Sequence, residues 1–176
     1  NGVLRDGESA INNQERSLDV ISFGTDYRGE RFRFSADIGY QDNRIDNPRP
    51  QVTPLGEVPI TPDADLNYAQ PGTFTDEQQL FGVIRGEYDI SDNTTFWAAI
   101  GGRNGDEANV LANPSALENG DTSAFRFDNT REDSIFSSDL GIRSRFSTNS
   151  VNHSLVVSAS IIDFESKNAF ALSSFF

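Results

Sequence analysis

The stretch Arg31-Phe32-Arg33-Phe34-Ser35-Ala36-Asp37-Ile38-Gly39-Tyr40 decides the fold of this chain. Its apolar residues recur at every second position, so an extended strand would place them all on one side. The opposite side would carry Arg31, Arg33, Ser35, Asp37 and Gly39. The stretch therefore predicts a half-apolar β-strand of about ten residues.

Five further segments alternate in the same way, some of them more weakly. The clearest is 135–146, which has apolar residues and serines at even positions and Asp139, Arg143 and Arg145 at odd ones. The others are 18–27, 80–90, 94–103 and 152–164. No long window shows the spacing of three and four residues that marks an amphipathic helix. We therefore expect one all-β unit over 1–176 with about six strands.

The connections between these strands are of two kinds. Three are short and lie near residues 28, 92 and 148, where Gly, Asn, Asp and Ser accept turn geometry. Two are long, 42–79 and 104–133, and each would follow a strand that runs in the same direction. The pattern predicts an antiparallel up-and-down β-meander with short turns at one end and long loops at the other. That layout is typical of a segment of a transmembrane β-barrel of the bacterial outer membrane.

Composition narrows the function classes. The chain has 14 Lys and Arg residues against 27 Asp and Glu residues, a net charge of −13, which argues against a nucleic-acid partner. There is no Cys, so disulfides and thiolate metal sites are excluded. No run of 18 apolar residues is present, so no transmembrane helix is expected. A search for long apolar runs does not detect barrel strands, because only every second residue of such a strand is apolar.

Two other readings fit the same alternation. A soluble, secreted β-sandwich that binds carbohydrate or another surface ligand would also have half-apolar strands, but it would bury them against a second sheet. A porin or autotransporter segment would share the barrel wall. Aromatic residues near the predicted strand ends favour a membrane wall, in which such residues form interfacial girdles. They are Tyr27, Tyr40, Tyr88, Trp97, Phe146 and Phe164.

Short stretches along the whole chain resemble, in the same order, the barrel of TonB-dependent ferric-siderophore receptors. The ferrichrome and hydroxamate branch is the most similar. The stretches that carry the resemblance are NGVLRDGE (1–8), TDYRGERF (25–32), ADIGYQ (36–41), DNPRP (46–50), RGEYDI (85–90), FRFDN (125–129) and SAS (158–160).

This resemblance implies a part of a barrel of about 22 strands with a plugged lumen, without the plug domain itself. It implies that the complete protein lies in the bacterial outer membrane, contacts its lipid, and binds and imports ferric siderophore with energy supplied through TonB. It implies neither enzymatic activity nor a resident cofactor. An isolated wall of this kind would have two open edges and an uncovered apolar face, so we expect it to self-associate.

Catalytic and metal-binding motifs are weak. The segment 61–67 echoes the first half of a calcium-binding EF-hand loop but lacks its glycine and its bidentate glutamate. The acidic residues in 128–133 could bind a structural Ca²⁺, and the sequence does not decide whether they do. His153 is the only histidine, and no nucleophile motif accompanies it. We predict no catalytic residue and no protein-bound metal.

Ligand recognition is expected in the extracellular loops. Bulky polar ligands are bound by aromatic surfaces together with a few directed donors such as arginine. The candidates are Arg49, Tyr68 and Phe74 in the first long loop, Phe125 and Phe127 in the second, and Phe170 after the last strand. Packing within their own loops is the alternative for each of them. The charged sides of the strands are expected to form cross-strand ion pairs.

Overall fold

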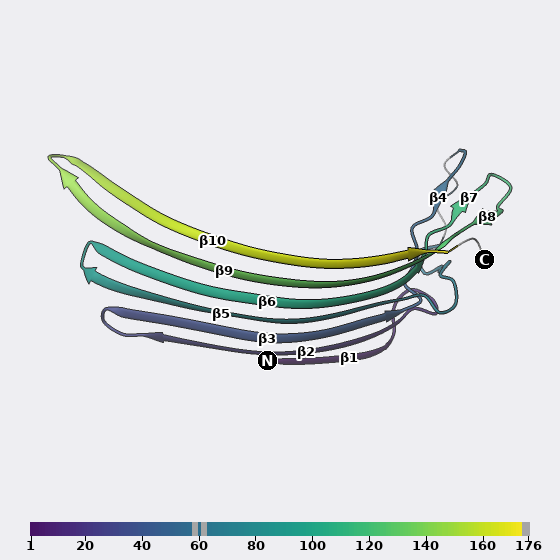
Figure 1. Cartoon of the computed structure of the whole chain (residues 1–176), viewed down its shortest axis with the longest axis horizontal. Coiled ribbons are helices and arrows are strands. Elements are labelled where there is room, and N and C mark those ends of the chain that lie inside the picture. The colour runs from purple at the N-terminus through teal and green to yellow at the C-terminus, as the bar shows by residue number, and fades with distance from the viewer. Residues whose placement is uncertain (58–59, 61–62, 174–176) are drawn as a thin grey trace.

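The computed structural model describes residues 1–57, 60 and 63–173, and these residues form an all-β structure (Figure 1). Strands β3, β5, β6, β9 and β10 are long and run side by side. The strands are β1 (Gly2–Glu8), β2 (Glu15–Arg28), β3 (Phe32–Asp46), β4 (Thr53–Pro54), β5 (Phe74–Ser91), β6 (Thr94–Ala112), β7 (Ser115–Ala116), β8 (Thr122–Ser123), β9 (Arg126–Thr148) and β10 (Val151–Leu172).

Seven of these strands form one sheet in the order β1-β2-β3-β5-β6-β9-β10. Each is antiparallel to its neighbours, so the predicted up-and-down meander is confirmed. Short connections at 29–31, 92–93 and 149–150 lie at one end of the curved sheet (Figure 1). At the other end β4, β7 and β8 form a second, small sheet. We call these the short-turn end and the long-loop end.

The strands are longer than the sequence indicated. β9 and β10 have 23 and 22 residues, and the hydrogen-bonded ladders enter both segments that were expected to be loops. β3 continues to Asp46 and β5 begins at Phe74, while β6 continues to Ala112 and β9 begins at Arg126. Most side chains on both faces are polar in these extensions. The alternation of apolar and polar residues therefore disappears there, although backbone pairing does not.

The register places side chains in rows across the sheet. One row runs from Phe23 through Ile38, Gly82 and Gly102 to Phe136. Rows of this parity form the apolar face. Its apolar band comprises Ile21, Phe23, Tyr27, Phe32, Phe34, Ala36, Ile38, Tyr40, Leu80, Ile84, Tyr88, Phe96, Ala98, Ile100, Phe136, Leu140, Ile142, Phe146, Leu155, Val157 and Ile161.

Nothing in the described residues covers this band. Phe32 is 45% exposed and Ile38 is 53% exposed, and Ala112 is the only buried hydrophobic residue of the part that is described. A β-sandwich would have buried the same side chains under a second layer. The soluble sandwich alternative is therefore wrong. No helix in the described ranges is long and apolar enough to cross a membrane.

The opposite, polar face contains two aromatic rings that lie over glycines. Trp97 faces Gly141 directly across β6 and β9, and Phe81 faces Gly39 across β5 and β3. A Cβ atom added to either glycine would overlap the facing ring. Trp97 Nε1 also donates a hydrogen bond to Asp139, at 2.5 Å. Trp97 was expected in an interfacial girdle, so its position on the polar face corrects the sequence interpretation. Phe164 shares this face and the same correction.

Replacing Ile100 by Arg should destabilise the folded wall in a lipid bilayer by about 2–4 kcal/mol, because the charge would enter the middle of the apolar band. Asn104→Arg lies on the same strand and face but beyond the band, and should cost about 0–1 kcal/mol. Urea unfolding of the complete barrel in vesicles measures both. Equal costs for the two variants would contradict the assigned limits of the band.

Gly141→Ala should destabilise the barrel by about 1–3 kcal/mol, because the new methyl group displaces the Trp97 ring and its hydrogen bond. Gly82→Ala is the control, since its nearest neighbour would lie at an ordinary 3.5 Å. Adding Trp97→Ala to Gly141→Ala should remove the overlap. If Gly141→Ala costs as much stability in the Trp97→Ala background as in the wild type, the ring does not lie against this glycine.

Candidate functional site

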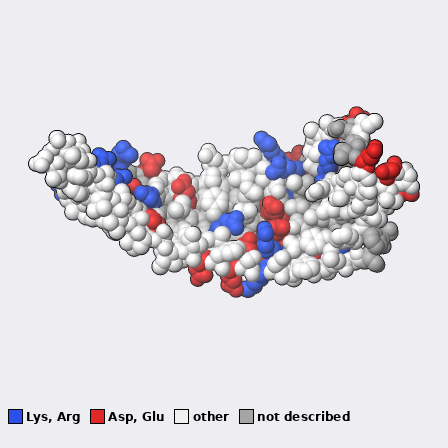
Figure 2. All heavy atoms as spheres, turned by 90° about the horizontal axis from the view of Figure 1, so that it is seen from above, with Lys and Arg blue, Asp and Glu red and all other residues white. Residues whose placement is uncertain are grey.

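The polar face holds the side chains that can contact a solute or another protein domain. Seen from above the view of Figure 1, acidic and basic side chains are intermixed, with uncharged surface between the groups (Figure 2). On the polar face the ion pairs occur in two clusters at different heights along the strands. An aromatic pair lies beyond the second cluster, at the long-loop end.

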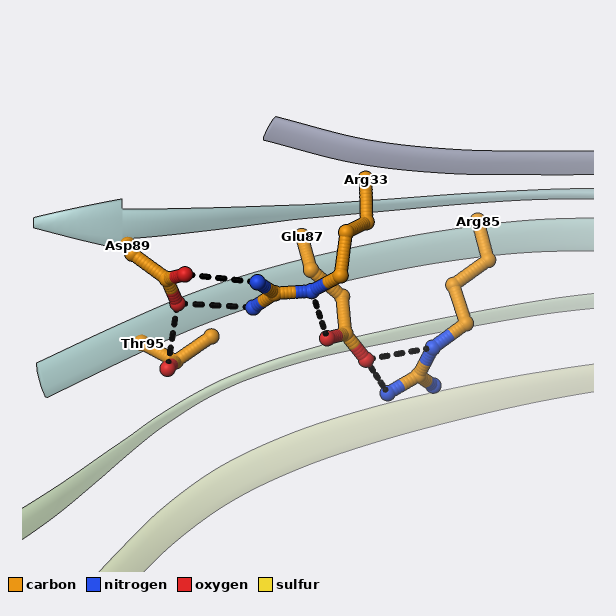
Figure 3. Close-up of polar contacts among 5 residues, drawn as sticks. All are labelled: Arg33, Arg85, Glu87, Asp89 and Thr95. Atoms are coloured by element: carbon orange, nitrogen blue, oxygen red, sulfur yellow. Dashed lines mark hydrogen bonds and ion pairs between the residues drawn. The ribbon is translucent and has the colours of Figure 1, made fainter. Parts of the chain in front are cut away.

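The lower cluster comprises Arg33, Arg85, Glu87, Asp89 and Thr95, near the short-turn end (Figure 3). Arg33 Nε donates to Glu87 at 3.0 Å, and its two terminal nitrogens donate to the two oxygens of Asp89 at 2.6 and 2.7 Å. Arg85 Nη2 donates to Glu87 at 2.8 Å, and Thr95 Oγ1 donates to Asp89 at 2.7 Å. The predicted cross-strand ion pairs are therefore present.

This arrangement holds the guanidinium of Arg33 in place, so its nitrogens are not available to bind a ligand. All three of its nitrogens donate to carboxylates on β5, and a planar fork matches a carboxylate in this bidentate way. Its side chain and those of both carboxylates are 25% exposed. Arg31 was expected on this face but lies in the turn, where its carbonyl accepts a hydrogen bond from the Asp89 N–H. The cluster is a rigid tie between β3 and β5.

The upper cluster lies further along β6 and β9, toward the long-loop end. Arg131 pairs with Glu107 and also approaches Asp133, at 3.4 Å. Ser166 Oγ donates to Asp133 at 2.6 Å, and Arg103 lies 3.9 Å from the same carboxylate. Arg103, Glu107, Arg131 and Asp133 line a small hollow of about 70 Å³. Within the described residues no group of three or more His, Asp or Glu side chains is arranged to hold a metal ion.

Phe127 and Phe170 form the aromatic pair. They lie on neighbouring strands, β9 and β10, with ring centroids 6.2 Å apart. Phe170 was expected in a loop after the last strand, but it lies inside β10 because that strand runs to Leu172. Asn109 of β6 lies in the same row across the sheet as Phe170. It is 8% exposed, and its Oδ1 has no hydrogen-bond partner among the described residues. This end of the polar face thus combines two rings with amide groups.

The other four candidates are not gathered at this pair. Arg49 donates from its guanidinium to the carbonyls of Ala64, at 2.8 Å, and Asp63, at 3.4 Å, so it holds its own loop together. Phe74 lies on the opposite side of the sheet, under the guanidinium of Arg44 at 4.4 Å. Tyr68 and Phe125 are exposed loop residues, at 36% and 45%. Their roles in ligand binding stay predictions.

His153 lies on the apolar face beside the turn between β9 and β10. Its ring stacks on Phe146 with centroids 5.0 Å apart. No carboxylate or hydroxyl of the described residues forms a hydrogen bond with it that could orient it as a base. The contact that the structure shows for His153 is thus packing against Phe146.

Two arginines lie beyond the apolar band on the apolar side of the sheet. The hydrogen bond from Arg126 to Asp128 raises the pKa of Arg126, and the hydrogen bond from Arg44 to Asp46 raises the pKa of Arg44. Each arginine is thus neutralised by a carboxylate two positions along the same strand. These paired cations leave the surrounding carboxylates in excess.

Comparison with known proteins agrees with this architecture. The ferrichrome receptor FcuA of Yersinia enterocolitica is 35% identical over 156 residues, which are 87% of this chain and 21% of the receptor. The crystal structure of BauA, the ferric preacinetobactin receptor of Acinetobacter baumannii, superposes with a TM-score of 0.93 at 25% identity, over 97% of this chain and 26% of that one. The siderophore receptor PiuA of the same organism gives 0.83 at 15% identity, over 98% of this chain and 28% of that one, and supports the fold alone. No family model matches the sequence.

A curved antiparallel wall with one uncovered apolar face and one charged face defines a segment of a membrane β-barrel. The chain belongs to the family of TonB-dependent siderophore receptors, of which it represents a part of the barrel wall. It spans about a fifth of the length of the ferrichrome receptor.

Arg33→Lys should lower the stability of the barrel, because a single ammonium group cannot replace three nitrogens that bind Glu87 and Asp89 together. Arg28→Lys is the control, since Arg28 forms no ion pair in the described part of the chain. Denaturant titration of the complete barrel gives both values. A cost for Arg33→Lys no larger than that of Arg28→Lys would mean that the fork does not tie the strands.

Proposed function

We propose that the complete protein is an outer-membrane receptor that binds and imports a ferric siderophore, and that this chain supplies part of its barrel wall. The observation that carries the proposal is the similarity to the ferrichrome receptor over 87% of the chain. The superposition on the ferric preacinetobactin receptor over 97% of the chain supports it independently. The transported ion would be held by the siderophore, so the proposal requires no metal ligands from the protein.

Within that receptor the polar face would line the lumen. The lower cluster would face the plug domain, and TonB would supply the energy for import through that domain. The apolar band would contact the lipid of the outer membrane. The upper end of the polar face would be reached first by a ligand that arrives from outside.

The aromatic pair is the part of this wall best suited to contact a bulky ligand. Phe127 and Phe170 present adjacent rings, and Phe170 is 66% exposed. Aromatic rings lose little conformational entropy when they bind, and amide groups such as that of Asn109 direct polar atoms. The upper cluster behind them supplies charges of both signs, which suits a weakly charged, polar ligand. The receptors named above bind different siderophores, so the wall identifies the class of ligand and not one compound.

An isolated form of this wall should associate with itself. β1 and β10 would present unpaired edges, and the apolar band would be open to water. Detergent or the remainder of the barrel would prevent this association.

Phe127→Ala combined with Phe170→Ala should weaken binding of the ferric siderophore to the complete receptor by about 1–2 kcal/mol, or roughly five- to thirtyfold in Kd. The reason is the loss of the paired rings at the outer end of the lumen. Fluorescence quenching or calorimetry with the purified receptor gives the Kd. Ferric hydroxamates and other ferric siderophores should be compared first, to find the one that binds.

Phe164→Ala is the matched control. Phe164 is 58% exposed on the same face of β10 but lies six residues nearer the short-turn end. It should leave the Kd unchanged. If no ferric siderophore binds the wild-type receptor, the proposed function is wrong. If the wild-type receptor binds a ferric siderophore but Phe164→Ala weakens binding as much as the double variant does, the proposed receptor function is supported and the assignment of Phe127 and Phe170 to the site is wrong.

A further inference from the structure

The negative charge of this chain is concentrated on one part of its surface. On the polar face, carboxylates and arginines are closely matched, as in the two clusters described above. On the apolar side, between the apolar band and the long-loop end, carboxylates outnumber cations. Arg44 and Lys167 are the cations of this zone on β3 and β10, and each already lies near a carboxylate, Asp46 or Glu165, of its own strand. We call this zone the acidic belt.

Carboxylates in the belt stand directly opposite one another on neighbouring strands. Asp106 of β6 is paired in register with Glu132 of β9, and Asp19 of β2 with Asp42 of β3. Like charges in such positions repel each other and destabilise a sheet. Lys167 of β10 is paired in register with Glu132, but its ammonium group lies 3.4 Å from Glu165 instead. Neither Asp106 nor Glu132 forms an ion pair with another residue of the described ranges. A cation supplied from outside the chain would relieve this repulsion.

The surface beside Asp106 and Glu132 is hollowed. One hollow of about 180 Å³ includes Asn104, Ser134 and Glu165 with these two carboxylates in its lining. A larger hollow of about 550 Å³ adjoins it toward the long-loop end, because both include Asp106, Glu132 and Lys167. Ala108 and Ala169 are part of its lining, and their small side chains leave this space open. These hollows can accept a group of several polar atoms rather than a single ion.

A third hollow lies on the same side of the sheet, within the apolar band. It has a volume of about 390 Å³, and Gly82 and Gly102 face each other across β5 and β6 at its floor. Ile38, Ile84, Ile100 and Phe136 form its sides. Gly102 is four residues from Asp106 along β6, a distance of about 13 Å in an extended strand. An apolar hollow and an acidic hollow thus follow one another along β6.

We propose that the apolar hollow and the acidic hollow beside Asp106 and Glu132, which together we call the lipid track, bind a membrane lipid. The headgroup of this lipid carries a net positive charge through primary amines. One apolar chain of the lipid lies in the Gly82–Gly102 hollow. Its amines lie between Asp106 and Glu132 and separate the two carboxylates. Carboxylates that repel each other select against a phosphate-rich anionic headgroup, so the charge of the belt decides between classes of lipid. The inference requires the apolar face to lie in a membrane, and it is independent of siderophore binding.

The test uses the complete receptor in detergent, titrated with lipids and followed by native mass spectrometry. The probes are lysyl-phosphatidylglycerol, which is cationic, and phosphatidylglycerol, which is anionic, with identical acyl chains. The wild-type receptor should bind the cationic lipid at least fivefold more tightly, and added salt should reduce the difference. Equal affinities, or a preference for the anionic lipid, would overturn the proposal.

Variants separate the two halves of the lipid track. Asp106→Asn with Glu132→Gln should remove most of the preference for the cationic lipid. Asp19→Asn with Asp42→Asn makes the same change of charge away from the hollow and should leave that preference unchanged. Gly82→Val should fill the apolar hollow and weaken binding of both lipids. Gly86→Val, on the same strand and face but outside the hollow, should not. The proposed site would be contradicted if the two double variants changed the lipid preference equally, or if the two glycine variants changed the lipid affinity equally.

Siderophore binding by each variant serves as the measure of correct folding. Intact siderophore binding without lipid preference would refute this inference alone. Loss of lipid preference in variants that still bind siderophore would support it.

Discussion

The wall depends on a single constraint, that a continuous backbone ladder must satisfy its hydrogen bonds while one face of the sheet stays uncovered. The inner strands β3, β5, β6 and β9 are paired on both sides along most of their length, so their peptide groups need no partner from the surroundings. The apolar side chains can therefore face hydrocarbon. In water the same surface would be a large exposed patch. The architecture is stable only where the solvent on that side is apolar.

The two faces use different means to hold neighbouring strands together. On the apolar face no second layer of the described residues packs against the strands, and large residues such as Ile38 stay exposed. On the polar face, strands are tied by arginine forks and by rings laid over glycines, as with Arg33 and Trp97. These ties are local and directional. They set the register, whereas the apolar band sets the height of the wall in the membrane.

The sequence was sufficient to predict the faces of the strands, because a period of two is read directly from residues such as Phe32, Phe34 and Ile38. It was also sufficient for the short turns near 28, 92 and 148, which carry the residues that such turns require. It failed at the long-loop end. There most residues of β3, β5, β6 and β9 are polar on both faces, so the sequence did not distinguish these extensions from loops. β1 was missed for the same reason, since GVLRDGE contains only two large apolar residues.

The candidate site was predictable only in part. Phe127 and Phe170 were named from composition, but only the register between β9 and β10 shows that their rings meet. The sequence cannot assign Trp97 to the polar face, because a ring over a glycine is a pairing between strands distant in sequence. The backbone contacts of Arg49 are equally hidden, since they depend on how a loop of many residues folds back. In each case the missing information is a long-range contact.

The most direct test of the central claim is the accessibility of spin labels placed singly at positions 32–41 of β3 in the complete receptor, reconstituted in lipid. Oxygen partitions into hydrocarbon, and a nickel chelate stays in water. If the wall is as described, labels at positions 32, 34, 36, 38 and 40 collide mainly with oxygen, and labels at the odd positions do not. A profile without a period of two, or one with the nickel chelate reaching the even positions, would contradict the account.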